Sequence, residues 1–282
     1  MQLFVDNLTN IDFSYLDSHS GLLGGTWLAH AVLGGRLDNQ GMVCDFGIVK
    51  SSLREWLNRE IDHRLAVPVR AANLSLEESA QSISLTWRFG LHRQLRCLCP
   101  RQAIALVDSE QITADSVSAW SIEQLRNQFP DTVAKLDLRF TEETIPGPSY
   151  RYSHGLKKHA GNCQRIAHGH RSRIEIWENG EPAPELELQW AQSWQDIYIG
   201  SREDLIGEVE KEHVGCYHFA YSAQQGAFEL IIPKQCCYLI DTDSTVELIA
   251  SHIAETLKQQ QPTSSFRVKA FEGIGKGAIA ER

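Results

Sequence analysis

The chain of 282 residues lacks several features that define large classes of protein. No apolar run approaches the length that crosses a bilayer, so we expect no membrane partner. The N-terminus, "MQLFVDNLTN", has neither a basic start nor a long apolar stretch, so we expect no signal peptide and a cytoplasmic protein. Acidic residues outnumber basic ones by 36 to 27, and a net charge of −9 argues against a nucleic-acid backbone as the main partner.

Paired cysteine motifs are also missing. The seven cysteines are an odd number without the regular spacing of a disulfide framework, so we interpret them as free thiols in a reducing compartment. Cys97 with Cys99, and Cys236 with Cys237, do not have CxxC spacing, so strand cysteines are a better interpretation than metal pairs. The remaining composition is that of a globular protein, with 42% hydrophobic residues and enough length for two domains.

The first half alternates strand and helix patterns. "WLAHAVLGG" is typical of a buried strand and "DNQG" of a turn, and Asp45 is placed to cap a helix that ends near "IDHRL". A second helix, "SVSAWSIEQLRNQF", is expected after Thr113, followed by the strand "KLDLRFTEET".

The second half repeats this order. "RSRIEIWENG" alternates and turns, and "WQDIYIGSREDL" stands where "VCDFGIVKSSL" stood in the first half. "STVELIASHIAETL" predicts a helix with a capping box from Ser244 to Glu247, and "FRVKAFEG" is a strand opposite "LDLRFTEET". We therefore predict two tandem strand–strand–helix–helix–strand–strand modules, residues 1–147 and 148–282, divided in "IPGPS". Each module carries a strand-rich insertion, roughly residues 66–112 and 206–240.

Histidines concentrate in "SYRYSHGLKKHAGNCQRIAHGH". His168 and His170 project from the same face of a strand, and Gly169 between them leaves room for a close approach. If the preceding strand folds beside this one, it brings His154 to the pair. Three histidines with an open fourth position are typical of catalytic zinc, although surface histidines are the alternative. His159 lies in a Lys-rich loop, where we expect it to be solvated.

Cys163 lies in the loop that leads to the second of these strands. A thiol beside a zinc ion and a further histidine would have a depressed pKa and could act as a base or nucleophile. An ordinary loop cysteine is the alternative that the bare sequence leaves open.

These segments are similar to those of a known family. "HGLKKHAGNCQRIAHGH" resembles the metal and cysteine segment of the 6-pyruvoyl-tetrahydropterin synthase family, which includes the 6-carboxytetrahydropterin synthases of queuosine biosynthesis. "GMVCDFGIVK" and "IDHRL" resemble its Asp-Phe helix start and its Asp-His pair. "STVELIA" resembles its second-helix opening, and "VKAFEG" and "RFTEET" resemble its Glu-bearing strand. The resemblance implies an α+β fold of two tandem T-fold modules, with antiparallel sheets and helices on one face, assembling into a barrel as a homo-oligomer.

The two copies depart from the family pattern in complementary ways. The first has "GLLGGTW" where His-Gly-His is expected, and so has lost its metal ligands. The second has "QDIYIG" in place of the Asp-Phe helix start, and no Asp-His pair. Family sites lie between subunits, so one complete site is expected where unlike modules meet, giving half as many sites as modules. Whether they meet within or between chains stays open.

The resemblance also implies roles. Zinc would be bound by His154, His168 and His170, Cys163 would be the base, and Asp62 would orient His63 beside it. The implied substrate is 7,8-dihydroneopterin triphosphate, and we expect 6-carboxytetrahydropterin as product. The pyruvoyl product and a non-catalytic pterin-binding protein are alternatives. Four residues separate Cys163 from His168, between the three of the carboxy type and the five of the animal pyruvoyl type.

Substrate contacts are assigned on the same basis. Glu272 is preferred over Glu143 as the pterin anchor, because it shares a module with the proposed zinc and Cys163. Thr113 and Thr245 would help to cradle the pterin ring, or would simply cap helices. For the triphosphate the candidates, each with surface charge as the alternative, are Arg165, Arg171 and Lys276.

Overall fold

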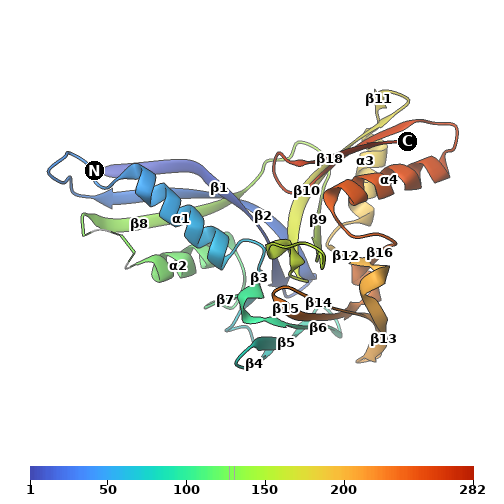
Figure 1. The fold of residues 1–282 in the computed structure, drawn as a ribbon, viewed down its shortest axis with the longest axis horizontal. Helices are drawn as coiled ribbons and strands as arrows, with labels where there is room; N and C mark the ends of the chain where they lie inside the picture. Colours follow the sequence, from blue (N-terminus) through green and yellow to red (C-terminus); the bar gives the residue numbers. More distant parts are fainter. Residues whose placement is uncertain (127, 130) are drawn as a thin grey trace.

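The computed structural model describes residues 1–126, 128–129 and 131–282. Two sheet-and-helix units lie side by side, and a third sheet lies below them (Figure 1). The N-terminal end lies at the far tip of the first unit and the C-terminal end on the second. No helix in the described part of the chain is long and apolar enough to span a bilayer.

The first unit is a five-stranded sheet in the order β7-β3-β1-β2-β8, covered by two helices (Figure 1). Its long hairpin pairs β1 with β2 antiparallel, and β8 continues the antiparallel pattern on the β2 side. The bounds are β1 Gln2–Asp17, β2 Gly21–Gly35, α1 Phe46–Glu60, β3 Leu65–Pro68, β7 Ile104–Val107, α2 Ala114–Leu125 and β8 Val133–Glu142.

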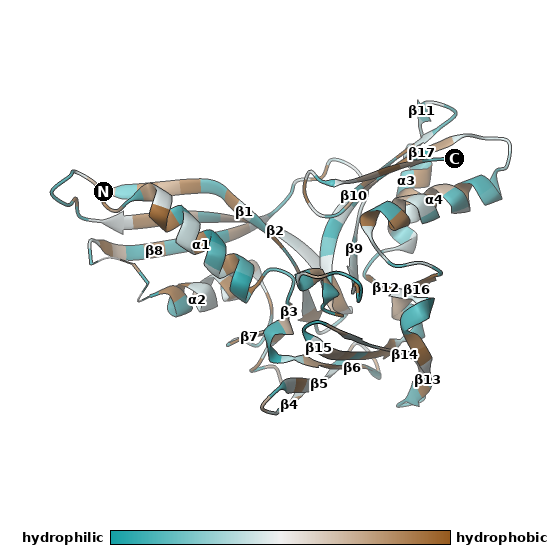
Figure 2. Ribbon diagram, viewed as in Figure 1, coloured by the Kyte–Doolittle hydropathy of each residue, from teal (hydrophilic) through white to brown (hydrophobic). Residues whose placement is uncertain are grey.

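The helix starts of the first unit agree with the sequence patterns. The Asp45 side chain accepts the Ile48 N–H and caps α1, and Val49, Leu53 and Leu57 are buried on its inner face. α1 accordingly shows both brown and teal bands in Figure 2. Thr113 caps α2 in a reciprocal box with Ser116. The expected second helix ran to residue 129, but the structure ends α2 at Leu125, and residue 127 lies outside the described residues.

The second unit has the sheet order β16-β12-β9-β10-β17-β18, with β11 paired to β10. Helices α3 and α4 pack against it, and its core includes Tyr150, Trp194 and Phe266. The bounds are β9 Ser149–His154, β10 His168–Glu178, β11 Glu181–Pro182, α3 Pro184–Ser193, β12 Ile197–Ser201, β16 Cys237–Ile240, α4 Val246–Gln260, β17 Phe266–Phe271 and β18 Gly277–Glu281.

Three details of the predicted repeat were wrong. The helix that corresponds to α1 is α3, so "WQDIYIG" does not replace the Asp-Phe helix start but follows α3 and forms β12. The N-cap of α4 is Thr245, whose side chain accepts the Leu248 N–H, so the box from Ser244 to Glu247 does not form. The first unit also has the single strand β8 after α2, whereas the second has both β17 and β18.

The third sheet is built from both insertions, in the order β13-β14-β15-β6-β5-β4. β15 pairs antiparallel with β6, with Leu230 opposite Cys97, so that the two insertions meet edge to edge. Brown, hydrophobic residues concentrate along β14, β15 and β6 in Figure 2. The bounds are β4 Leu74–Glu78, β5 Ser82–Phe89, β6 Arg93–Pro100, β13 Leu205–Lys211, β14 Val214–Ala223 and β15 Gly226–Pro233.

The strand registers relate the two units by an approximate two-fold. His63 and Asp196 both have positive φ, 55° and 58°, and lie at most two residues before β3 and β12. Aligning them makes Ser14 of β1 equivalent to Ser153 of β9. The two serine hydroxyls lie 2.7 Å apart and bond to each other across the interface between the units.

Glycines let the two units approach closely at this point. A Cβ at Gly169 would lie 2.8 Å from Ser14 Oγ and 2.9 Å from Gly24 Cα, and would also meet the Tyr152 carbonyl. A Cβ at Gly24 would lie 2.6 Å from the His170 carbonyl oxygen. The glycine between the two histidines therefore makes room for β2 of the first unit.

Candidate active site

Three histidines meet at the end of the β9–β10 pair. His168 stands directly opposite His154, and His170 lies one pleat further along the same face. All three side chains are fully buried, and the rings of His154 and His168 are 4.3 Å apart between centroids. One ring nitrogen of each lies within 4.8 Å of those of the other two.

The polar contacts of these rings fit a metal ion. His154 Nδ1 lies 3.0 Å from both the carbonyl oxygen and the hydroxyl of Ser244, and His168 Nδ1 lies 2.9 Å from the Arg165 carbonyl oxygen. The Nε2 atoms of all three histidines are buried, and none has a hydrogen-bond partner among the residues that the structure describes. Burial lowers the pKa of His154 and His168 well below the usual range, so these two rings are neutral, as metal ligands must be. Zinc, which favours histidine nitrogen, suits this donor set.

Asp12 is a part of the site that the sequence patterns did not suggest. It belongs to β1 of the first unit, is almost fully buried, and places Oδ1 3.2 Å from His170 Nδ1. The two atoms are close, although the contact does not have the geometry of a hydrogen bond, and His170 Nδ1 has no other partner in the described part of the chain. Burial alone would raise the pKa of Asp12, but His170, Lys276 and the Thr26 hydroxyl hold it well below its ordinary value. A buried carboxylate beside a ligand histidine commonly fixes the ring orientation.

The Asp-His pair of the first unit lies beside the cysteine of the second, within one chain. His63, Cys163 and His168 each offer a ligand atom within 4.8 Å of the others. Asp62 Oδ2 lies 2.6 Å from His63 Nδ1, and Asp62 Oδ1 accepts the Asp12 backbone N–H at 2.8 Å. Burial would lower the pKa of His63, but the interactions with Asp62 and Cys163 outweigh it and raise that pKa to about 10. In this structure the ring is therefore charged at neutral pH.

Glu272 and Lys276 lie at the rim of the cluster. Glu272 Oε1 is 3.8 Å from His170 Nε2 and keeps 22% of its side chain exposed. Lys276 Nζ lies 3.1 Å from Asp12 and 3.7 Å from Glu272. A partly exposed carboxylate and an ammonium group thus stand next to the buried histidines, where a substrate could reach them.

Several other candidates lie elsewhere. Glu143 faces Arg173 at 3.9 Å, and the register of β8 makes its neighbour Glu142 the equivalent of Glu272. Arg171 bonds to the Glu143 carbonyl oxygen and Arg165 to backbone oxygens of the Asp62–His63 segment, so both arginines serve protein contacts. The side-chain hydroxyls of Thr113 and Thr245 cap α2 and α4, although Ser244 next to Thr245 contacts His154.

The equivalent positions of the first unit carry no imidazole. The registers place Tyr15, Leu23 and Gly25 where the second unit has its three histidines. In place of a metal cluster, Glu142 there lies 2.6 Å from Arg151 and 3.3 Å from Arg171, and accepts the Trp27 indole N–H.

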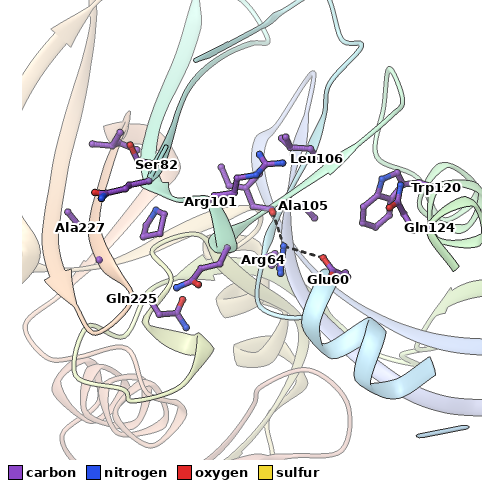
Figure 3. A pocket seen from close by; sticks show the side chains of 16 residues that line it. Glu60, Arg64, Ser82, Arg101, Ala105, Leu106, Trp120, Gln124, Gln225 and Ala227 are labelled. Carbon is purple, nitrogen blue, oxygen red and sulfur yellow. Dashed lines mark hydrogen bonds and ion pairs between the residues drawn. The ribbon is translucent and has the colours of Figure 1, made fainter. Parts of the chain in front are cut away.

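A cavity of about 990 Å³ opens on the far side of Arg64, the residue after His63 (Figure 3). Its lining includes Arg64, Arg101 and Gln225, and Figure 3 shows Arg64 paired with its neighbour Glu60 in the lining. The three histidines and Cys163 are not among its lining residues, so the cavity is separate from the cluster.

Comparison with known proteins decides the family. The family model described as 6-pyruvoyl tetrahydropterin synthase matches the chain twice, over residues 17–150 and 147–282. The chain belongs to the 6-pyruvoyl tetrahydropterin synthase family. It is a two-module member, with sheets and helices that form T-fold modules. The division at residues 147 and 148 stays a prediction, although the chain passes from β8 to β9 between Glu142 and Ser149.

Solved structures that match part of this chain include a Plasmodium vivax 6-pyruvoyltetrahydropterin synthase that carries a substitution of a catalytic residue. It is 16% identical, with a TM-score of 0.41 over 50% of this chain and 90% of that chain. The Plasmodium falciparum 6-pyruvoyl tetrahydropterin synthase is 14% identical, with the same TM-score and coverage. A search of curated proteins gave no significant match. Membership of the family supports a pterin-processing function of the lyase type.

Proposed function

We propose that the protein is a zinc-dependent lyase that converts 7,8-dihydroneopterin triphosphate to 6-carboxy-5,6,7,8-tetrahydropterin, a step of queuosine biosynthesis. One observation carries the proposal. Three buried histidines with unpartnered Nε2 atoms, a half-buried thiol and an Asp-His pair converge in one chain, although two modules supply them. Each module lacks what the other supplies, and decay without selection gives no reason for the retained parts to meet.

In this proposal His154, His168 and His170 hold the zinc ion. When bound, zinc would act as a Lewis acid that stabilises the charge developing on the side-chain oxygens of the substrate. The chain prepares the ligands by holding the Nδ1 atoms of His154 and His168 against Ser244 and the Arg165 carbonyl. Asp12 faces the Nδ1 of His170 in the same way.

Cys163 would be the general base in this reaction. His63 and Cys163 lie within reach of each other, and the cysteine would take the proton from the substrate side chain. Asp62 fixes the orientation of His63 and keeps its ring charged. Triphosphate would then leave by elimination, and the carboxy product also requires loss of a two-carbon aldehyde.

Glu272 would anchor the pterin. A carboxylate can accept two adjacent N–H groups, as the 2-amino group and ring N–H of a pterin present them. Its side chain is partly exposed and lies beside His170, which would put the pterin next to the zinc ligands. Lys276 would be the nearest cation to the phosphates. Glu143, Thr113 and Thr245 have protein contacts that account for them without a substrate.

Product analysis tests the proposal. Zinc-loaded protein is incubated with 7,8-dihydroneopterin triphosphate, and the products are separated and identified by mass. Formation of 6-carboxytetrahydropterin is expected, with a loss of rate in Cys163→Ala and none in Cys237→Ala, which removes the other half-buried thiol. The pyruvoyl product would assign the protein to the other branch of the family. No turnover with zinc bound would favour a pterin-binding protein.

The proposed assembly is a homo-oligomer. β8 and β18 are edge strands in the described part of their sheets, and edge strands in such folds commonly pair with another subunit to close a barrel. The cytoplasmic location stays a prediction.

A further inference from the structure

The loop between β9 and β10 carries Cys163 within a short 3-10 turn, Asn162–Gln164. Within the loop, the Leu156 N–H donates to the Cys163 carbonyl oxygen, and Gln164 Nε2 donates to the Gly161 carbonyl oxygen at 2.9 Å. Gln164 is fully buried, so another part of the chain covers it. The covering part is the hairpin of β14 and β15, which belongs to the insertion of the second module.

The tip of this hairpin bonds to the residues on both sides of Cys163. The Gln225 backbone N–H donates to Gln164 Oε1 at 2.6 Å, and Gln225 Nε2 donates to Asn162 Oδ1 at 2.9 Å. The Tyr221 hydroxyl donates to the Gln164 carbonyl oxygen at 2.8 Å. Cys163 lies between the two residues that the hairpin holds.

The same glutamine links the cysteine loop to the Asp-His pair. Gln225 Oε1 accepts from Arg165 Nε at 3.0 Å, and Arg165 Nη1 reaches the carbonyl oxygens of His63 and Asp62 at 3.3 and 3.5 Å. Arg165 is almost fully buried. One side chain of the insertion thus contacts the thiol loop directly and the Asp62–His63 backbone through a single arginine.

The backbone is shaped for these contacts. Gly155 leaves the space that the Tyr221 hydroxyl occupies, since a Cβ there would meet that oxygen and lie 2.7 Å from Ile166 Cα. Gly226 turns the hairpin tip with a φ of 135°, and a Cβ there would lie 2.8 Å from Pro100 Cγ of the other insertion. The hairpin tip therefore rests on the first module while it holds the loop of the second.

We propose that Gln225 and Tyr221 are positioning residues that hold the Cys163 thiol at its working distance from His63 and His168. The hairpin of β14 and β15 is then a functional part of the site. The inference rests on the proposed role of Cys163 as base. Figure 3 shows Gln225 at the wall of the 990 Å³ cavity, so its replacement by alanine removes a side chain that borders open space.

The test compares Gln225→Ala with Gln224→Ala, which removes the exposed neighbouring glutamine of the same turn. Gln225→Ala should lower kcat about tenfold, since small misplacements of reacting groups cost that much or more. The KM, zinc content and thermal stability of Gln225→Ala should stay close to those of the wild type, as should all properties of Gln224→Ala.

The double variant Gln225→Ala/Asn162→Ala tests whether the two side chains act as a pair. Its fold loss of kcat should be smaller than the product of the two single losses. Tyr221→Phe, which keeps the ring, should show a smaller loss of kcat and serves if Gln225→Ala folds poorly.

Amide hydrogen exchange gives a readout that needs no turnover. The peptide that contains residues 160–167 should exchange several-fold faster in Gln225→Ala than in Gln224→Ala. Wild-type exchange together with wild-type kcat in both Gln225→Ala and Tyr221→Phe would overturn the inference. Failure of the proposed function would appear instead in the wild type, as absence of product, or in Cys163→Ala, as an unchanged rate.

Discussion

Asp12 belongs to the first module, yet its carboxylate faces His170 of the second. It is held in place by the Thr26 hydroxyl at 2.6 Å and by Lys276 at 3.1 Å. A carboxylate on the far nitrogen of a ligand histidine fixes the ring orientation and makes the ring a better donor. Asp12 therefore connects the docking of the first module directly to one of the proposed metal ligands.

Replacing Asp12 by asparagine should weaken zinc binding by roughly 10- to 100-fold, because the ligand loses its oriented, charged neighbour. Competition with a chromogenic chelator measures the affinity without any need for catalysis. Asp6 is an exposed carboxylate on the same strand. Its variant Asp6→Asn is the control and should bind zinc with the affinity of the wild type. Equal affinities for the two variants would show that Asp12 has no influence on the metal ligands.

Two local motifs indicated most of the residues that the structure brings together. Spacing suggested His-x-His with a surface-histidine alternative, the family resemblance pointed to the Asp-His pair, and the two motifs lie side by side. Asp12 and Ser244 were not predictable, since their roles depend on a module interface and on the register between β9 and the start of α4. Glu142 and Glu143 are adjacent, and only the pairing of β8 with β2 shows which of them is the equivalent of Glu272.

At the scale of elements, the sequence predicted the long strands and the capped helices but misplaced one helix. α3 begins at Pro184, and the side chain of its N-cap residue, Ala183, makes no capping hydrogen bond. The sequence therefore has no capping residue before α3 like the Asp45 that precedes α1, and "WQDIYIG" was aligned with α1 although it forms β12. Its true position before β12 is shown by the positive φ of Asp196, which matches that of His63.

The glycine contact between β2 and the second module gives a prediction about stability. In Gly24→Ala the new methyl group would meet the Tyr152 carbonyl and lie 2.6 Å from the His170 carbonyl, so the modules must separate or shift. We expect the free energy of unfolding to fall by about 1–3 kcal/mol, measured by urea denaturation. Gly34→Ala lies on the same strand, where the nearest atom is 3.6 Å away, and should cost little. A similar cost at both positions would argue against close docking at Gly24.

The charged cluster in the first module predicts a pH dependence. Burial would raise the pKa of Glu142, but Arg151, Arg171 and the Trp27 indole lower it below the ordinary value of 4.5. Because the folded pKa is lowered, Glu142 stabilises the fold above the unfolded value, and this contribution is lost as the pH falls through the folded pKa.

Glu142→Gln should therefore be less stable than wild type near pH 7 by about 1 kcal/mol, a small figure because a third of the side chain is exposed. The difference should shrink as the pH falls below about 4.5. Denaturation at several pH values measures it, with Glu110→Gln, an exposed carboxylate, as the control. A difference that stays constant down to acid pH would contradict the lowered pKa.

At the scale of the whole molecule, His63 and Cys163 come from different modules of the same chain. Chains that carry His63→Ala and chains that carry Cys163→Ala should therefore fail to restore each other's activity when co-expressed. Each mixed assembly would still have one defect in every site. The rate of product formation measures the outcome, and recovery of activity would mean that the site is shared between chains.

The segment between Glu142 and Ser149 also has a consequence for how the protein behaves at low concentration. It tethers the two halves of the site, so their encounter is intramolecular and is governed by an effective concentration, which dilution does not change. A site divided between separate subunits loses its second half when the subunits part. In this protein the two halves of the proposed site lie on one chain, so they are synthesised together and are always present in equal number.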